Sequence, residues 1–352
     1  MKKQPESGST APAEPLPGAT VRVAPLMPLP TLLREHGCDP EPVFRQAGLP
    51  MEFWDHPETE VSFVAASRLL EESVAASGCD HLGLLIGERA QLSSLGLAGL
   101  MLRYAPDARV AIDVLMENLN LHDSGGLATL DITGQTVKFG YQVREAGVSA
   151  IDQIYDMSIS VACNIMRELC GAHWSPSKVV LCRKQPRHSK PYSQFFHAPL
   201  ELNAAANYLE FPLSWLNSPN ASADPHLFRY FSERAGEQQA SNDSFLLSNL
   251  QRMILNAIFH QNCSVEHVAR QLGMHQRTLN RKLGKFDTNF RKELEKMRFE
   301  LSRQMLANQQ ISINEIASFL DYSDQAAFSR AFREWSGVSP SAWRSGARQR
   351  ET

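Results

Sequence analysis

The feature that most constrains this chain is a segment near its C-terminus that occurs twice. Residues 264–283, SVEHVARQLGMHQRTLNRKL, place apolar side chains at helical spacing in two short runs, and residues 312–332, SINEIASFLDYSDQAAFSRAF, repeat the arrangement. Two helices that cross steeply need a small residue at their contact, and Ala269 and Ala317 hold that place. Each segment therefore predicts a helix, a tight turn and a second helix.

The turn and the start of the second helix differ between the two units. Gly273 occupies the first turn, and Asp321 occupies the second, where a left-handed backbone is tolerable for aspartate. Ser323 is the expected N-cap of the later helix, and His275 is the weaker cap of the earlier one. Five apolar residues are assigned to the core of the units: Leu272, Leu279, Phe328, Phe332 and Trp335.

Between the repeats, residues 288–308 carry an apolar stripe at helical spacing. As a helix this segment would span about 32 Å at a rise of about 1.5 Å per residue. Successive major grooves on one face of B-DNA lie roughly 34 Å apart. We therefore expect two helix-turn-helix units, at 264–283 and 312–335, that lay their second helices in adjacent grooves.

The exposed face of the first recognition helix carries side chains suited to base edges. Arginine fits guanine, and glutamine or asparagine fits adenine. The candidates are Gln276, Arg277, Asn280 and Arg281. Three basic residues are expected to contact phosphates, which adds affinity without sequence information: Lys282, Lys285 and Arg333. The alternative for any single residue is an ordinary solvated helix face.

Charge is distributed unevenly along the chain. Residues 241–352 hold 16 Lys and Arg against 11 Asp and Glu, whereas the rest of the chain holds 19 against 27. A basic C-terminal third points to a polyanionic partner for that part alone.

The remaining sequence predicts a separate domain of mixed structure. Residues 126–143 alternate around a Thr-Gly turn and predict a hairpin, and residues 200–212 predict a second one. Residues 151–170 predict a long apolar helix. The fold class is thus an α+β regulatory domain followed by an all-α double helix-turn-helix domain.

Composition sets the expected boundaries. Residues 1–20 are rich in Pro, Ser and Gly with almost no large apolar side chain, so we expect a disordered tail. The α+β domain is expected at 21–235 and the all-α domain at 241–346, because apolar residues nearly vanish between 234 and 243.

The C-terminal part resembles the DNA-binding domain of the AraC/XylS family of bacterial transcription regulators. The two units, the helix between them and the closing GVSPSAWR at 337–344 carry the resemblance, which covers about residues 245–345. Residues 82–115 and 195–212 are similar to the effector-binding domain of one branch of that family. Asp321 stands where the family usually has glycine, and His275 where serine or threonine is common.

This resemblance implies a sequence-specific regulator that binds double-stranded promoter DNA, senses a small-molecule effector and activates through RNA polymerase. It carries the base-reading role to four residues of the second unit: Gln325, Ala326, Ser329 and Arg330. The effector-binding residues are unknown, although an apolar pocket lined from residues 82–121 and 151–170 is expected. Whether a homodimer forms stays open.

Two other functions could also use a DNA-binding C-terminal part. An enzyme that uses the C-terminal domain as a DNA tether, such as an alkyl-transfer repair protein, needs an activated cysteine beside a general base. Cys263 lies between Asn262 and Ser264, without an activating neighbour in sequence, so we expect no enzyme. Architectural binding without sequence preference would give equal affinity for promoter and random DNA at fixed salt.

Metal and membrane signals are weak. Four histidines could suggest a metal site, but none pairs at i, i+4 or joins a compact Cys/His cluster, so neither metal nor cofactor is expected: His122, His173, His188 and His197. Six scattered cysteines without a CxxC pair are typical of free thiols in a reducing compartment. No apolar run approaches the roughly 20 residues of a membrane span. We therefore expect a cytoplasmic protein.

Overall fold

The computed structural model describes residues 18–145, 147–240, 244–259, 262–272, 274–307 and 311–348. The first 17 residues of the expected tail and the turn residue Gly273 lie outside the described residues. Thr20, at the end of that expected tail, already belongs to a strand.

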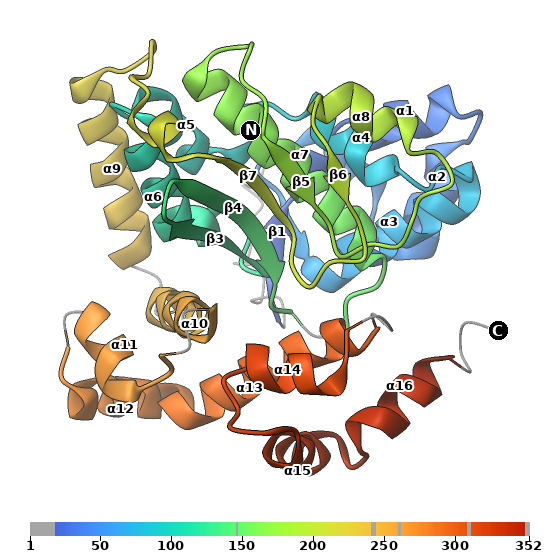
Figure 1. The fold of residues 1–352 in the computed structure, drawn as a ribbon. Helices are drawn as coiled ribbons and strands as arrows, with labels where there is room; N and C mark the ends of the chain where they lie inside the picture. The colour runs from blue at the N-terminus through green and yellow to red at the C-terminus, as the bar shows by residue number, and fades with distance from the viewer. Residues whose placement is uncertain are drawn as a thin grey trace, which may run out of the picture.

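The N-terminal part combines two sheets with covering helices (Figure 1). Strands β1 (Thr20–Arg22) and β2 (Glu60–Ser62) form an antiparallel pair. The larger sheet has five strands in the order β3-β4-β7-β5-β6. Their bounds are β3 Gly126–Thr133, β4 Thr136–Val143, β7 Tyr208–Pro212, β5 Lys178–Val180 and β6 Leu200–Glu201.

The first predicted hairpin is confirmed. Strands β3 and β4 pair antiparallel from Gly126 opposite Val143 to Thr133 opposite Thr136. Gly134 takes a φ of 60° in the turn, a left-handed conformation that glycine adopts at little cost. This hairpin forms one edge of the larger sheet.

The second predicted hairpin is wrong. Strand β6 pairs parallel with β5, and β5 separates it from β7. Leu209 and Phe211 of β7 are buried opposite Phe139 and Val137 of β4, so the apolar alternation marks a real strand. Alternation predicts which residues face a core, but it does not choose a strand's neighbours.

Nine α-helices cover these sheets among the described residues. They are α1 Leu29–Glu35, α2 Pro40–Ala47, α3 Phe63–Ser77, α4 Leu82–Arg89, α5 Leu97–Tyr104, α6 Ala108–Asn118, α7 Ile151–Cys170, α8 Lys190–Phe196 and α9 Pro225–Ala240. Helix α7 has the bounds that the sequence predicts. Helix α9 runs through most of the segment at 234–243 where apolar residues nearly vanish.

Helix α7 is held in place by a close crossing with α4. A Cβ atom on Gly83 would lie 2.1 Å from the carbonyl oxygen of Gln153, and one on Gly87 would lie 2.6 Å from that of Met157. Only glycine permits two backbones to approach this closely. The position of α7 is therefore fixed by two residues of another helix.

A buried ion pair fixes the other face of α7. Arg183 donates to the carboxylate of Asp156 and contacts the hydroxyl of Tyr192, which itself donates to Asp156 at 2.5 Å. The side chains of Asp156 and Arg183 are 0% and 6% exposed. Burial raises the pKa of Asp156 to about 7, against the opposing attraction of Arg183.

The C-terminal part is wholly helical in its described residues and has a core of its own. Its helices are α10 Ser244–Phe259, α11 Val265–Gln271, α12 Gln276–Leu283, α13 Phe290–Ala307, α14 Ile313–Phe319, α15 Gln325–Ser336 and α16 Pro340–Arg348. Leu127 of β3 packs into this second core rather than the first. In Figure 1, α10, α13 and α14 face the α+β part, and α12 and α15 lie on the far side.

Candidate DNA-binding interface and effector cavity

The first repeated segment folds as a helix-turn-helix. Helix α11 packs on α12. Ala269 of α11 and Leu279 and Leu283 of α12 are all buried, as the prediction requires. His275 is the N-cap as expected, and its Nδ1 atom accepts a hydrogen bond from the backbone N–H of Arg277 at 3.3 Å. The histidine thus does the work of a serine or threonine at the start of the recognition helix.

The second unit repeats this geometry in α14 and α15. Ala317 of α14 is buried, and Asp321 takes a φ of 61°, the left-handed conformation expected of the turn. The expected N-cap is wrong by one residue, because the carboxylate of Asp324, not Ser323, accepts the backbone N–H of Ala327 at 2.7 Å. A carboxylate is the stronger cap since it also interacts favourably with the helix dipole.

The helix between the units is shorter than predicted. Helix α13 begins at Phe290 because Asn289 accepts the backbone N–H of Lys292 at 3.0 Å and so caps the helix. Its described 18 residues correspond to about 27 Å rather than about 32 Å. Its apolar stripe is confirmed, with Met297, Leu301 and Met305 among its buried residues.

Helix α13 is joined firmly to the second unit. The guanidinium of Arg298 donates to the carbonyl oxygen of Asp321 at 3.2 Å and lies 4.7 Å from the ring centre of Tyr322. The turn of the second unit is thereby tied to the linker helix. The spacing between the two recognition helices is then a property of rigid packing rather than of a flexible connection.

The closing GVSPSAWR segment is structural. Gly337 ends α15 with a φ of 79°, Pro340 is the first residue of α16, and Trp343 packs edge-on against Phe332. Arg344 donates to the carbonyl oxygen of Ile311 at 2.7 Å. These residues complete the core of the second unit. The outer face of α15 takes no part in that core.

The outer faces of α12 and α15 present most of the residues expected to read bases. Six of the eight are exposed: Arg277, Asn280, Arg281, Gln325, Ala326 and Arg330. Gln276 and Ser329 are half-buried. The three residues expected at phosphates, Lys282, Lys285 and Arg333, are all exposed.

The basic side chains of α12 and α15 differ from those of α13 in their ion pairing. Within the described part of the chain, no salt bridge involves Arg277, Arg281, Lys282, Arg330 or Arg333. By contrast, Arg291 on α13 is paired with Glu295 at 2.8 Å. Arg330 lies near the exposed carboxylate of Asp324, which reduces its local charge, whereas cations without an acidic partner attract an anion more strongly.

Asn280 has a second role that its sequence position does not reveal. Its side-chain oxygen accepts the backbone N–H of Phe290 at 3.2 Å, at the first residue of α13. The amide NH₂ group is left for other partners. Asn280 therefore couples the recognition helix α12 to the linker helix α13.

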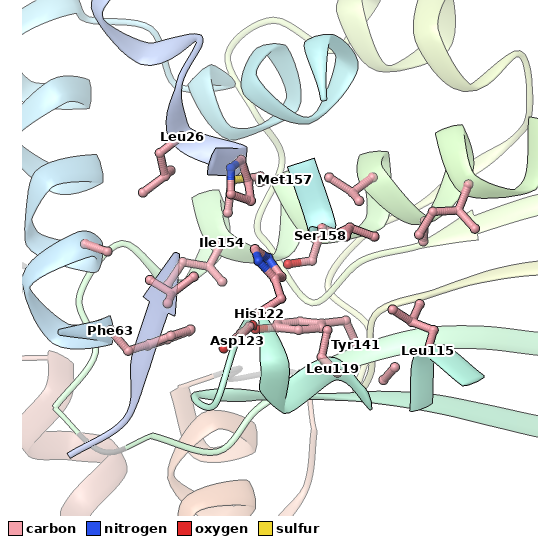
Figure 2. Close-up of a pocket in the computed structure, with 18 of the residues that line it drawn as sticks. Leu26, Phe63, Leu115, Leu119, His122, Asp123, Tyr141, Ile154, Met157 and Ser158 are labelled. Atoms are coloured by element: carbon pink, nitrogen blue, oxygen red, sulfur yellow. The ribbon is translucent and has the colours of Figure 1, made fainter. Parts of the chain in front are cut away.

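The α+β part contains a cavity of about 80 Å³. Apolar side chains from several elements form most of its wall, including Leu26, Phe63, Leu115, Phe139 and Ile154. Figure 2 labels four of these, Leu26, Phe63, Leu115 and Ile154, around the polar side chains of His122 and Ser158. Apolar pockets with a few polar groups are typical of small-molecule sites.

Five polar side chains line this cavity: Ser67, His122, Asp123, Tyr141 and Ser158. The ring of His122 and the hydroxyl of Ser158 point into its middle in Figure 2. Tyr141 donates its hydroxyl to the buried carboxylate of Asp123. Burial, aided by the positive charge of Arg22, lowers the pKa of His122 to about 3, so its imidazole is neutral at pH 7.

The two stretches that the sequence predicts as pocket lining, residues 82–121 and 151–170, form only part of the wall of this cavity. Ile154, Met157 and Val161 of α7 line the cavity, and Leu115 and Leu119 come from the other predicted stretch. Sequence reasoning missed the residues from β1, α3, β3 and β4, the pair Pro25 and Leu26, and the turn that follows Leu121. His122 was weighed only as a metal ligand, and no motif marks Tyr141 or Ser158.

Comparisons with known proteins agree with this architecture. The arabinose-binding domain of AraC transcription regulators, N-terminal, matches residues 37–220, and a helix-turn-helix domain matches residues 268–346. The first match alone spans more than half of the chain.

The chain belongs to the AraC family.

Its relatives are regulators of transcription. The HTH-type transcriptional regulator VirS of Mycobacterium tuberculosis is 26% identical over 343 residues, covering 93% of this chain and 97% of VirS. The ornithine utilization regulator of Pseudomonas aeruginosa is 27% identical over 324 residues, covering 89% and 93%. The crystal structure of the transcriptional regulator CdpR from P. aeruginosa aligns at a TM-score of 0.44 and 22% identity, covering 87% and 96%.

This AraC-family protein is thus a DNA-binding transcription regulator with an N-terminal effector-binding domain, and not the DNA-tethered enzyme weighed above. Its cysteines fit that conclusion. Burial raises the pKa of Cys263 to about 11 and that of Cys163 to about 12, so neither is an activated nucleophile at pH 7. Among the described residues, no helix is both long and apolar enough to cross a membrane.

The two parts of this AraC-family chain are joined by a polar contact. Tyr155 of α7 donates its hydroxyl to the side-chain oxygen of Gln304 on α13 at 2.7 Å, and Gln304 donates to the carbonyl oxygen of Val143 at 3.0 Å. Gln142 also donates to Gln304. A cavity of about 720 Å³ adjoins this contact, and Ile151 and Phe319 line its opposite sides.

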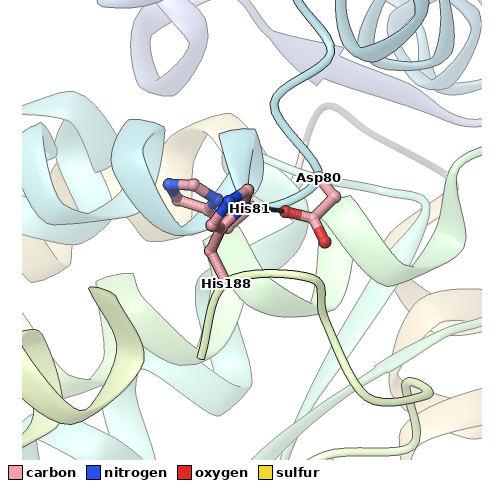
Figure 3. Close-up of side chains that lie close together, drawn as sticks. All are labelled: Asp80, His81 and His188. Carbon is pink, nitrogen blue, oxygen red and sulfur yellow. Dashed lines mark hydrogen bonds and ion pairs between the residues drawn. The ribbon is translucent and has the colours of Figure 1, made fainter. Parts of the chain in front are cut away.

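One histidine cluster was missed by sequence reasoning. His188 lies beside Asp80 and His81, with ligand atoms within 4.8 Å of one another (Figure 3). The carboxylate of Asp80 already accepts hydrogen bonds from His81 and from the backbone N–H of Arg187. Against the effect of burial, the hydrogen bonds from Arg187 and His81 and the positive charge of Arg183 lower the pKa of Asp80, and that positive charge opposes a cation at the same place. We assign no ion to this cluster.

Proposed function

We propose that this protein recognises promoter DNA by placing α12 and α15 in successive major grooves. The observation that carries the proposal is the pair of exposed recognition helices joined by the packed helix α13. The base-reading residues are proposed to be Gln276, Arg277, Asn280, Arg281, Gln325, Ala326, Ser329 and Arg330. Lys282, Lys285 and Arg333 are proposed to contact phosphates.

The two units are not equivalent in this proposal. Unit one carries four basic residues on and beside α12, whereas Arg330 and Arg333 are the basic residues of α15. Affinity for the backbone would come mainly from the first unit, since each phosphate contact releases bound counterions. The second unit would add discrimination at fewer positions.

The regulatory part is proposed to span residues 21–235 and the DNA-binding part residues 241–346. Within the former, the cavity beside His122 is proposed as the effector site. Helix α7 supports a route for the signal, because Ile154 and Ser158 line the cavity while Tyr155 contacts Gln304. A ligand that moves α7 would bias how α13 is held.

Three partner assignments belong to the same proposal. Activation would occur through contact with RNA polymerase, in the cytoplasm. A second copy of the chain would bind where paired promoter sites exist, and the exposed Leu227 and Tyr230 of α9 offer an apolar surface for it. Sedimentation of the full chain with and without promoter DNA distinguishes one copy from two.

The test of DNA recognition is a binding assay on the upstream region that footprinting identifies. Arg277→Ala and Arg330→Ala are each expected to lose about 1 to 3 kcal/mol of discrimination at one base pair. Arg45→Ala, on an exposed helix of the regulatory part, is the matched control and should bind like the wild type. Unchanged affinity and sequence preference in both test variants would refute the assigned roles.

A further inference from the structure

The cavity beside His122 offers few polar contacts. Its described wall contains no Lys or Arg side chain, and aliphatic or aromatic groups make up most of it. A ligand that enters must lose its water, so each polar group it brings needs a partner there. The number of free partners therefore limits the chemistry of the ligand.

Of the polar groups at the cavity, Asp123 is already used. One carboxylate oxygen accepts the backbone N–H groups of Gly125 at 2.7 Å and Gly126 at 3.1 Å, and the other accepts the hydroxyl of Tyr141. These contacts stabilise the turn that follows Leu121 and the start of β3. Asp123 and Tyr141 therefore hold the wall together and do not supply hydrogen bonds to the ligand.

His122 is different. Its side chain is buried, with the residue only 8% exposed, and its Nδ1 atom has no hydrogen-bond partner among the described residues. A buried polar atom without a partner costs about 1 to 3 kcal/mol. A ligand group that bonds to the imidazole would recover that cost, and Ser158 stands beside it in the cavity.

Charge at the ligand is disfavoured. An anion would meet the Asp123 carboxylate without any cation in the wall. A cation would find the oxygens of Asp123 already accepting three hydrogen bonds, and it would be repelled by the positive Arg22 behind the neutral imidazole. A sugar would bring several hydroxyl groups against His122, Ser158 and Ser67 alone. Both classes would leave buried polar groups unpaired.

We propose, on the basis of the effector site assigned under the proposed function, that the effector is a small, uncharged and mainly apolar molecule with one hydrogen-bonding group. An alcohol, a phenol or a ketone meets this description. Its polar group bonds to His122 and Ser158, and its apolar body lies against Phe63, Leu115 and Ile154.

Size adds a condition. A cavity of about 150 Å³ binds benzene, and this one is about 80 Å³ in the structure. A ligand as large as phenol must therefore displace part of the wall. Met157 of α7 has a flexible side chain that can move aside for the ligand. Binding would therefore displace part of α7, the helix that contacts α13.

The experiment measures thermal unfolding of the full chain with three probes. Phenol is expected to raise the unfolding temperature saturably, by at least about 2 °C well above its Kd. Benzoate adds a charge to the same ring, and L-arabinose replaces the ring with hydroxyl groups, so neither should match phenol. Calorimetric titration gives the affinities.

Variants locate the binding. His122→Phe keeps the ring shape and is expected to weaken phenol binding about tenfold, whereas His173→Phe, at an exposed position, should leave it unchanged. Ala162→Leu fills the cavity from α7 and should abolish binding. If that variant fails to fold, the smaller change Ala66→Val on α3 tests the same point.

The inference is overturned if benzoate or L-arabinose binds as tightly as phenol, if none of the three binds, or if the folded cavity-filling variant retains wild-type affinity. Promoter binding is measured separately on the same samples. Loss of phenol binding with intact promoter binding would refute this inference alone, and the reverse result would refute the DNA-binding proposal alone.

Discussion

The hydroxyl of Tyr155 and the side-chain oxygen of Gln304 lie 2.7 Å apart, and this hydrogen bond joins the helix beside the cavity to the helix that connects the two recognition units. The two residues are 149 positions apart in sequence. Gln304 in turn donates to Val143 at the end of β4. One side chain therefore links the sheet, α7 and α13.

Gln304→Ala should loosen this contact. Tyr155 and Gln142 keep their mutual bond at 2.8 Å, and Gln142 still donates to the carbonyl oxygen of Val143 at 3.2 Å. The buried hydroxyl of Tyr155, however, loses its acceptor, which costs about 1 to 3 kcal/mol where water does not replace it. Hydrogen exchange followed by mass spectrometry should show faster exchange in α13 and β4. The exposed Gln91→Ala is the control. Equal exchange in both variants would show that the contact does not hold the two parts together.

Lys282→Ala and Lys285→Ala should weaken binding to promoter and random duplexes alike. Each lost phosphate contact lowers the slope of log affinity against log salt by about 0.9. Anisotropy titrations at several salt concentrations measure that slope. A change in base preference without a change in slope would assign these lysines to bases instead.

Asp324→Ala should destabilise the second unit by about 0.5 to 2 kcal/mol, because the cap of α15 is lost. Ser323→Ala, one residue earlier, should have little effect since its hydroxyl bonds only to Asp324 in the described structure. Urea unfolding of both variants compares them directly. The reverse order of stability would restore Ser323 as the cap.

Breaking the buried pair of Asp156 and Arg183 should be costly. Asp156→Asn leaves the guanidinium buried without a counter-charge, which is expected to lower the free energy of unfolding by about 3 to 5 kcal/mol. The double variant Asp156→Leu with Arg183→Met should recover part of that loss, because no lone charge stays buried. In the exposed pair of Glu41 and Arg45, Glu41→Gln should cost about 1 kcal/mol or less.

The buried His122 should make stability depend on pH. Its pKa is about 3 in the folded protein and about 6.5 when unfolded, so the unfolded state binds the extra proton as pH falls below 6.5. Between pH 7.5 and 5.5 this lowers the free energy of unfolding by about 1.4 kcal/mol. The loss continues towards pH 3.

His122→Phe should remove that component, and His173→Phe should not. Urea unfolding at the two pH values measures the difference for each variant. A wild-type protein whose pH dependence matches that of His122→Phe would show that the imidazole becomes protonated in the folded state.

The sequence by itself determined the local elements and the family. Ala269 and Ala317 mark helix crossings whatever surrounds them, and the alternation in residues 126–143 specifies a hairpin because its turn is local. These features follow from short-range sterics and apolar spacing, which a linear pattern records. The α7 helix was predictable for the same reason.

Only the tertiary structure decided which elements contact one another. The pairing of β6 with β5, the hydrogen bond from Phe290 to Asn280 and the bond from Tyr155 to Gln304 each join residues from different elements. The cavity likewise draws its wall from strands and helices far apart in the chain. Apolar periodicity says which side of an element is covered, but not by what, because many faces are equally apolar and only packing in three dimensions selects among them.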